Sequence, residues 1–264
     1  MSTHELKQDT KAFCFDIFGT CVDWRKSVTN ELVNASEKVV DKSSSASSPA
    51  QSTARRMSRK DWAEIAAEWR ATYYKFTRGL AADPKATFKT VDEHHHDALI
   101  ELLAAHGLEG LWDEAEIRHL SQVWHRLDSW ADTNEGLKIL GKHFDTCTLS
   151  NGNVTLLKDM QHHSGMVFTH TFSGEMFGTY KPNPKVYLGA AEKLGLKPEQ
   201  VVMVAAHIQD LKAAKGCGLQ TIFVDRPEEE FGDLEQARKE GYVDLWVGPD
   251  EGGFLGMTKK IGLN

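Results

Sequence analysis

The chain has 264 residues, 41% of them hydrophobic and 26% charged, which suits one large globular domain or a core domain with a smaller partner. A formal net charge of −7 disfavours nucleic-acid binding, which needs clustered lysine and arginine side chains, so we expect no nucleic-acid partner. The sequence shows no apolar run near the ~20 residues of a membrane span and no signal-peptide pattern. Its four cysteines are scattered without a CxxC spacing, so we expect a cytoplasmic protein with reduced thiols and no membrane contact.

The first predicted strand ends at an acidic residue. Residues 12–15 form a short, β-prone apolar run, and Asp16 follows it directly. Helical periodicity then predicts four helices, over residues 27–40, 58–78, 91–106 and 113–127. Ser58 followed by Asp61 is typical of a capping box at the start of the second helix. The Ser-rich residues 42–57 carry little apolar surface to offset the entropy of ordering, so they predict a flexible loop.

Strands alternate with helices in the rest of the chain. Strands are predicted over residues 144–149, 168–173, 201–206, 221–224 and 244–247, and helices over 154–161, 184–194 and 210–217, with a weak helix at the end. This alternation indicates an α/β fold, a doubly wound, Rossmann-like parallel sheet covered by helices on both faces. We therefore predict a core domain of residues 1–21 and 129–264, with a helical domain of residues 22–128 inserted after the first strand.

Polar side chains follow three of the predicted strands, and a lysine stands in a loop between two of them. These residues are Asp16, Ser150, Asn151, Lys181, His207 and Asp210. Ligands of open α/β sheets bind outside the carboxyl ends of the strands, where these residues should converge. Each alone is a weak signal, because such residues are common in turns. Together, and in this order, they predict an active site.

Four segments resemble the motifs of a known superfamily. They are DIFGT at 16–20, LSNG at 149–152, YKP at 180–182 and the strand leading into Asp210. They resemble the haloacid dehalogenase superfamily, and its type II (S)-2-haloacid dehalogenases in particular, over about residues 11–247. The resemblance implies that family's core fold with a helical cap domain, a small anionic substrate, and neither a metal nor a cofactor; a homodimer is compatible with it.

The resemblance also implies a covalent mechanism. Asp16 would attack the halogen-bearing carbon in line, and water would then hydrolyse the resulting ester. Lys181 would keep Asp16 ionised, and Asp210 would fix Lys181 or the hydrolytic water. Thr20 and Ser150 would hydrogen-bond with Asp16, Lys181 or the substrate carboxylate. The product would be a 2-hydroxy acid of inverted configuration.

Further side chains are expected to bind the substrate or the departing halide. Arg70 lies beside the core-facing stripe of its helix, within the string Glu68-Trp69-Arg70 that resembles the family's halide-binding site. The residues expected to act with it are Asn151, Phe88, Tyr187 and Phe18. The alternative interpretations are a surface arginine whose stem covers apolar neighbours and ordinary core aromatic residues.

The residue two positions after Asp16 separates branches of the superfamily. Its phosphatases usually carry a second aspartate there, which acts as general acid, and they use Mg²⁺. Phe18 can do neither. A halide leaves without a proton, so the sequence favours a dehalogenase over a phosphatase.

Two positions depart from the best-known dehalogenases, which carry serine at the position of Ala205 and asparagine at the position of His207. A neutral His207 could act as a base for ester hydrolysis, with an acid limb in the pH–rate profile near its unperturbed pKa of about 6.5. It could equally provide an orienting hydrogen bond. Both interpretations stay open at this point.

Other functions remain in view. A hydrolase on the same scaffold could open a strained ring such as azetidine-2-carboxylate, with His207 or Tyr187 donating the proton that the amine needs. A catalytically silent binding protein is disfavoured by the presence of Asp16 with Lys181 and Asp210. The histidine run 94–96 could suggest a metal, but consecutive helical residues point in different directions, so a solvated helix face is favoured.

Overall fold

The computed structural model describes residues 6–42, 48–83 and 85–263. Six parallel strands form one sheet in the order β3-β2-β1-β4-β5-β6. The strands are β1 (Ala12–Phe15), β2 (Asp145–Ser150), β3 (His170–Ser173), β4 (Val201–Ala205), β5 (Gln220–Val224) and β6 (Leu245–Val247). The strand order reverses at β1, which pairs with β2 on one side and β4 on the other. Such a switch point opens a crevice at the carboxyl ends of the strands.

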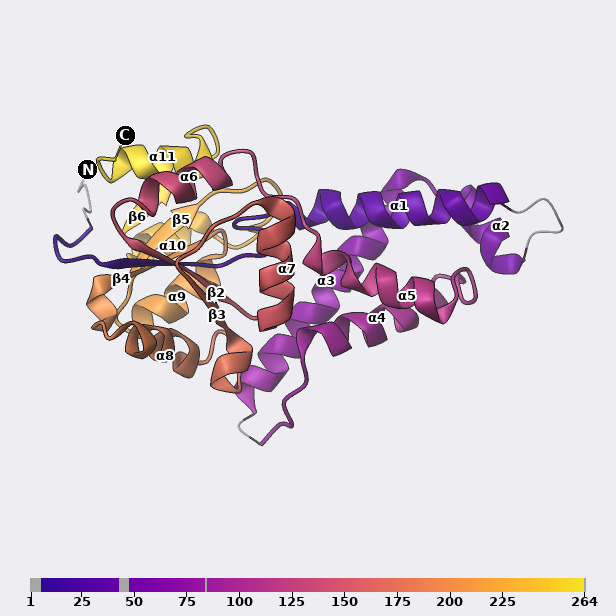
Figure 1. The fold of residues 1–264 in the computed structure, drawn as a ribbon, viewed down its shortest axis with the longest axis horizontal. Helices are drawn as coiled ribbons and strands as arrows, with labels where there is room; N and C mark the ends of the chain where they lie inside the picture. Colours follow the sequence, from indigo (N-terminus) through magenta and orange to yellow (C-terminus); the bar gives the residue numbers. More distant parts are fainter. Residues whose placement is uncertain (1–5, 43–47, 84, 264) are drawn as a thin grey trace.

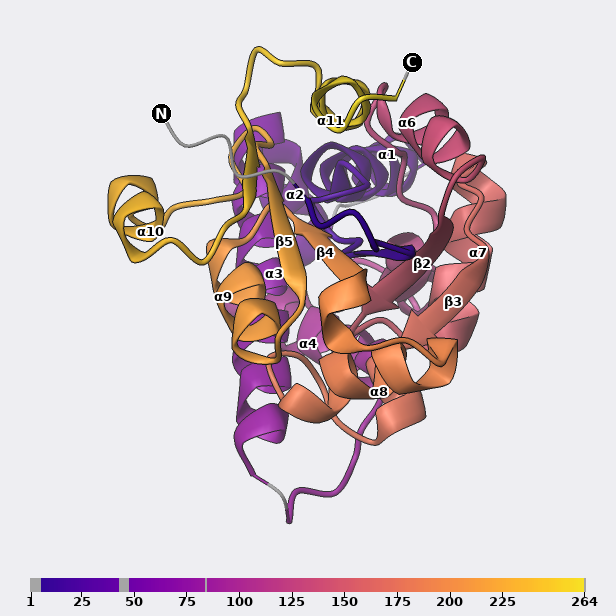
Figure 2. The same ribbon diagram turned by 90° about the vertical axis from the view of Figure 1, so that its left-hand side faces the viewer.

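Helices cover both faces of the sheet (Figures 1 and 2). One face carries α6 (Thr133–Leu140), α7 (Val154–Ser164) and α11 (Gly253–Lys260), and the other carries α8 (Pro184–Leu194), α9 (Ile208–Gly216) and α10 (Leu234–Glu240). Side chains alternate between the faces with the period of two that strands impose. Phe13 and Phe15 therefore join the first cluster, while Cys14 joins the second. The predicted doubly wound sheet is confirmed.

The helical region lies beyond the carboxyl ends of the strands (Figure 1). It contains α1 (Trp24–Lys42), α2 (Pro49–Arg56), α3 (Arg59–Ala82), α4 (Val91–Ala105), α5 (Glu114–Ser121) and the short 3-10 helix η1 (Gln122–His125). Two further 3-10 turns, η2 (Gly174–Phe177) and η3 (Pro198–Gln200), belong to the core. The predicted capping box at the start of α3 is confirmed, because the Ser58 hydroxyl accepts from the Asp61 N–H and the Asp61 carboxylate accepts from the Ser58 N–H.

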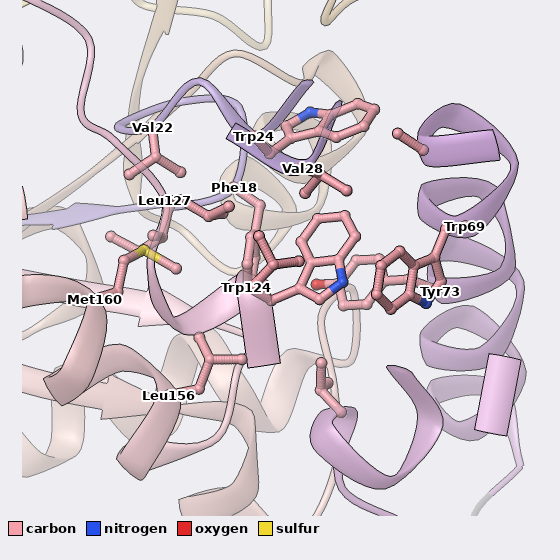
Figure 3. Close-up of a cluster of buried hydrophobic side chains, with 14 of the residues drawn as sticks. Phe18, Val22, Trp24, Val28, Trp69, Tyr73, Trp124, Leu127, Leu156 and Met160 are labelled. Carbon is pink, nitrogen blue, oxygen red and sulfur yellow. The ribbon is translucent and has the colours of Figure 1, made fainter. Parts of the chain in front are cut away.

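An aromatic cluster joins the helical region to the core. Figure 3 shows Trp124 of η1 between Phe18, which follows β1, and the α3 side chains Trp69 and Tyr73. The ring centroids of Trp124 lie 6.0 Å from Phe18 and 5.4 Å from Trp69. Burial of such large rings contributes on the order of 2 kcal/mol each, so this contact holds α3 against the crevice.

The flexible loop predicted over residues 42–57 is wrong for its second half. Residues 49–56 form α2, which starts with Pro49 and is capped by Ser48. Ala50 and Ala54 are buried, and this burial supplies the stabilisation that composition alone did not indicate. Residues 43–47 of the predicted loop lie outside the described residues.

Two short helices, α6 and α10, were not predicted. In α6, Gly136 resembles a helix breaker, but a Cβ there would collide with the Cβ of Phe254 on α11. The glycine thus allows close packing of α6 on α11, a tertiary reason that no local pattern carries. Among the described residues, no helix is both long enough and apolar enough to span a bilayer.

Candidate active site

The carboxylate of Asp16 lies at the end of β1 and is 8% exposed. Its Oδ1 accepts from Lys181 Nζ at 2.9 Å, and its Oδ2 accepts from Thr20 Oγ1 at 2.8 Å and faces His207 Nδ1 at 3.1 Å. Burial alone would raise the pKa of Asp16, but the positive charge of Lys181 and the hydrogen bond from His207 hold it well below its usual range. Asp16 is therefore a carboxylate at any ordinary pH.

Lys181 is held at both ends. Its backbone N–H donates to Asn151 Oδ1 at 2.7 Å, and its ammonium donates to Asp210 Oδ2 at 2.5 Å as well as to Asp16. The Tyr187 hydroxyl donates to the other Asp210 oxygen at 2.5 Å. Burial alone would lower the pKa of Lys181, but the carboxylates of Asp16 and Asp210 raise it above its ordinary value. Asn151, directly after β2, and Asp210, in the first turn of α9, thus hold Lys181 as a cation beside Asp16.

His207 lies between two carboxylates, after β4. Its Nδ1 is 3.1 Å from Asp16 Oδ2, and its Nε2 is 3.3 Å from Glu229 Oε2 and 3.1 Å from the Tyr74 hydroxyl. Burial alone would lower the pKa of His207, but Tyr74, Asp16 and Glu229 together raise it well above 6.5. An imidazolium has no lone pair to receive a proton from water. The geometry therefore favours the hydrogen-bonding interpretation over the base, and no acid limb near 6.5 is expected from this group.

Arg70 reaches the site from α3 and is 4% exposed. Its guanidinium stands over the rings of Tyr73 and Tyr74, both at 4.5 Å, and of Phe18 at 5.1 Å. Its Nη2 donates to the Tyr74 hydroxyl at 3.1 Å and to the Phe18 carbonyl at 3.4 Å. Its Nε and Nη1 are buried with no hydrogen-bond partner in the described part of the chain. A buried cation with two unpartnered nitrogens, which together carry three N–H groups, is suited to bind an anion.

These groups surround a cavity of about 80 Å³. Of the predicted site residues, it is lined by Asp16, Arg70, Asn151, Lys181, Tyr187, His207 and Asp210. An outer cavity of about 530 Å³ shares the walls Arg70, Tyr74 and His207 and opens toward solvent. Larger hollows, of about 700 and 870 Å³, lie along α1 and α5 and beside the first described residues, away from these converging charges.

The remaining predicted residues lie outside this lining. Thr20 is buried behind Asp16, where its hydroxyl accepts from the Ala206 N–H at 2.9 Å. Ser150 is also buried, and its hydroxyl accepts from the Gly152 N–H at 3.2 Å; within the described residues no hydrogen bond joins it to Asp16 or Lys181. The Ser150 hydroxyl thus takes part in the turn after β2 and hydrogen-bonds with neither Asp16 nor Lys181.

Two predicted aromatic residues pack away from Asp16. Phe88 packs on the ring of Tyr180, with 5.2 Å between centroids, and does not line the cavity. Phe18 is 1% exposed, and its ring packs under the Arg70 guanidinium.

Ala205, at the position where the best-known dehalogenases have serine, is fully buried within the second core cluster.

Tyr74 and Glu229 also contact the site residues, and neither was predicted from the sequence. Tyr74 lies four residues after Arg70, a spacing that places both on one helix face and could have revealed it. Glu229 belongs to an acidic run after β5 that looks like solvated surface, yet its side chain is 4% exposed. It packs against Gly19, where a Cβ would collide with its carboxylate and where φ is +83°. Gly19 therefore makes room for Glu229 beside His207.

The histidine run on α4 is not the solvated face that was expected. His95 is fully buried between the rings of Trp124, at 4.5 Å, and Trp69, at 5.9 Å. His94 stacks on Phe76 at 4.4 Å. Burial and the charge of its neighbours lower the pKa of His95 well below 6.5. These histidines act as neutral aromatic packing residues.

A model of the haloacid dehalogenase-like hydrolase family matches residues 10–218. Because that match covers most of the chain, the protein belongs to this family. Among solved structures, an L-2-haloacid dehalogenase is 31% identical to the chain, with a TM-score of 0.77, over 96% of this chain and 100% of the other.

Curated relatives match over shorter stretches. (S)-2-haloacid dehalogenase 4A of Burkholderia cepacia is 29% identical over 183 residues, which are 66% of this chain and 75% of that protein. Haloacetate dehalogenase H-2 of Moraxella sp. (strain B) is 28% identical over 127 residues, 47% of this chain and 57% of that protein. The chain thus spans little more than half the length of the Moraxella relative.

Proposed function

We propose that the protein hydrolyses the carbon–halogen bond of a small (S)-2-haloacid, without a metal, and releases the 2-hydroxy acid of inverted configuration. One observation carries this proposal: a buried carboxylate, Asp16, shares a small cavity with a buried guanidinium, Arg70, that has unpartnered N–H groups in the described chain. A carboxylate nucleophile opposite an anion site suits displacement of an anionic leaving group at carbon. The names of the relatives support the same chemistry.

In the first step, Asp16 attacks the carbon and the bonding pair leaves with the halide. We assign the attack to Oδ1, because it accepts one hydrogen bond, from Lys181, whereas Oδ2 faces both Thr20 and His207. Lys181 keeps the nucleophile ionised. Arg70 supplies the charge that stabilises the departing halide as the bond breaks.

In the second step, water attacks the carbonyl carbon of the Asp16 ester. The negative charge then develops on Oδ2, where the Thr20 hydroxyl and the His207 imidazolium already point. Two preorganised donors at that oxygen act as an oxyanion hole. Asp210, whose pKa burial raises, is the carboxylate that we assign to receive a proton from the water. When the tetrahedral intermediate collapses, the bond between the Asp16 carboxyl carbon and Oδ1 breaks, the product leaves with Oδ1, and its alkoxide takes the proton back from Asp210.

The cavity size restricts the substrate. About 80 Å³ is well below the roughly 300 Å³ at which pockets for drug-sized ligands begin, so a two- or three-carbon acid is the expected class. We propose that residues 22–128 act as a cap domain whose helix α3 closes this cavity, because Arg70 and Tyr74 form its wall.

One observation favours a second candidate. A protonated His207 beside Asp16 could donate the proton that an amine leaving group needs, as in the opening of azetidine-2-carboxylate. Formation of the ring-opened hydroxy amino acid, in the absence of any halide release from 2-haloacids, would favour this candidate.

The direct test is halide release from (S)-2-chloropropionate and from its (R) enantiomer, each with EDTA present. We expect release from the (S) form alone, undiminished by the chelator, and none from the Asp16→Asn variant. Hydrolysis of p-nitrophenyl phosphate that requires Mg²⁺, without halide release from either enantiomer, would instead assign the protein to the phosphatases of the family.

A further inference from the structure

The hydroxyl of Tyr74 lies between two cations. Tyr74 is on α3, is partly buried, and lines both the inner cavity of about 80 Å³ and the outer one of about 530 Å³. Its oxygen accepts from Arg70 Nη2 at 3.1 Å and lies 3.1 Å from His207 Nε2. The hydrogen-bond direction in the second contact decides what the hydroxyl can do.

The surroundings of His207 settle that direction. Nδ1 faces Asp16 Oδ2, and Nε2 faces Glu229 Oε2 at 3.3 Å. An ionised carboxylate only accepts hydrogen bonds, so each ring nitrogen must carry a hydrogen to make these contacts. Glu229 is buried, with 4% of its side chain exposed, so water does not replace it as the partner of His207 Nε2. His207 therefore donates from Nε2, and that hydrogen is shared between Glu229 and the oxygen of Tyr74.

Counting the groups on the Tyr74 oxygen leaves one hydrogen without a partner. A phenolic hydroxyl has one hydrogen and accepts through its oxygen lone pairs. Arg70 and His207 both donate to that oxygen, so its own hydrogen must point away from both cations. No acceptor for this hydrogen lies within hydrogen-bond distance in the described part of the chain. Tyr74 lines two cavities in which a partner for this hydrogen can bind, and the inner one also holds Asp16.

Tyr74 lies on the side of the cavity where the departing halogen is expected. His207 contacts Asp16 through one nitrogen and Tyr74 through the other, so one imidazole ring separates the hydroxyl from the nucleophile. In-line attack requires the carbon ~3–3.5 Å from the Asp16 oxygen and the leaving group on the far side of that carbon. On the α3 side of the cavity stand Arg70 and Tyr74.

We propose that the Tyr74 O–H donates a hydrogen bond to the departing halogen and thereby determines which halogens the protein removes. The proposal rests on the dehalogenase function proposed above. As Asp16 forms its bond to carbon, the carbon–halogen pair leaves with the halide, and Tyr74 keeps its proton throughout. The hydrogen bond strengthens as charge develops on the halogen, so it acts in the transition state. Fluoride is the strongest acceptor among the halides, so it gains most, and bromide gains least.

The test compares Tyr74→Phe with the wild type on fluoro-, chloro- and bromoacetate, with single-turnover rates of ester formation as the readout. Loss of a hydrogen bond to a charged group costs ~1.5–3 kcal/mol, or roughly 10- to 150-fold in rate. We expect a loss in that range for fluoroacetate, a smaller one for chloroacetate and less than about threefold for bromoacetate. KM should change little, because the ground-state halogen is a weak acceptor.

Two further variants sharpen the result. Tyr73→Phe removes the hydroxyl of the neighbouring tyrosine, which lines the same cavity but bridges no pair of cations, so its effect should not depend on the halogen. Tyr242→Phe, in the second core cluster and outside the lining of the inner cavity, should leave all three rates unchanged. Equal losses for the three substrates in Tyr74→Phe, or a halogen-dependent loss in Tyr73→Phe instead, would overturn the assignment of Tyr74. Absence of halide release from every substrate in the wild type would overturn the proposed function itself.

Discussion

Replacing Glu229 by glutamine should destabilise the fold because it removes one charge of a buried ion pair. Glu229 Oε2 lies 3.3 Å from His207 Nε2, and the two side chains are 4% and 16% exposed. At that distance, an effective dielectric constant of about 20 gives a Coulomb energy of about 5 kcal/mol. The amide oxygen of glutamine can still accept the hydrogen bond, so part of the interaction remains. We expect a loss of about 3 kcal/mol in the free energy of unfolding.

The pH dependence of this stabilisation has a definite sign. The pKa of His207 is raised in the folded protein above its unfolded value of about 6.5. The contribution of the imidazolium is therefore fully present below pH ~6.5 and is lost as the pH rises through the folded-state pKa. Glu229→Gln removes one of the groups that raise the pKa of His207, so this loss should begin at a lower pH than in the wild type.

A double-mutant cycle with His207→Asn measures the coupling. Each single variant keeps one charge of the His207–Glu229 pair and removes the other, whereas the double variant keeps neither charge of this pair. Urea unfolding should therefore show that the double variant costs at least about 2 kcal/mol less than the sum of the singles, with unchanged m values. Single losses under about 1 kcal/mol that add without coupling are the behaviour of exposed pairs. That result would refute the view of His207 and Glu229 as a buried, charged pair.

Three more expectations concern the reaction and the helical region. Arg70→Ala should slow ester formation by roughly 10²–10³-fold, and Arg70→Lys should recover only part of the rate. The control Arg118→Ala, at an exposed position on α5, should leave the rate of ester formation unchanged. Because the pKa of Asp16 is lowered and that of His207 is raised, the pH–rate profile should be level through pH 5–7 and fall only as the pH rises through the pKa of His207; a fall on acidification near 6.5 would contradict this. The Asn153 amide oxygen accepts from the first N–H groups of α4 and so joins the core to the helical region. Asn153→Ala should therefore lower the free energy of unfolding by ~1–3 kcal/mol and raise KM. An unchanged KM would show that this contact does not support substrate binding.

The parts of the site that the sequence predicted are those set by local order along the chain. Asp16, Lys181 and Asp210 each follow or join elements with clear apolar periodicity, and parallel strands bring their carboxyl ends to one edge. The sheet and the convergence of these three charges could therefore be predicted before any contact was known. Arg70 was predicted from its place beside the core-facing stripe of α3, and it is buried there.

The parts that were missed depend on contacts between distant segments. Glu229 meets His207 through a loop after β5 that has no periodicity, and an acidic run is ordinarily solvated. His95 is buried because Trp69 and Trp124 approach it from other elements, which a histidine run does not indicate. Ser150 is a different case: it was predicted from its motif position, and its hydroxyl takes part in a local turn, because serine readily bonds the backbone two residues on.

The covalent role of Asp16 is the central claim, and a single turnover in isotopically labelled water tests it most directly. With enzyme in excess over (S)-2-chloropropionate, water oxygen should enter the Asp16 carboxylate, because hydrolysis occurs at the ester carbonyl, and the first 2-hydroxy acid should be unlabelled. Mass spectrometry of the peptide that contains Asp16 would show the gain of one labelled oxygen. Label that appears first in the product, with an unlabelled Asp16, would mean that water attacks the substrate directly and would contradict the mechanism.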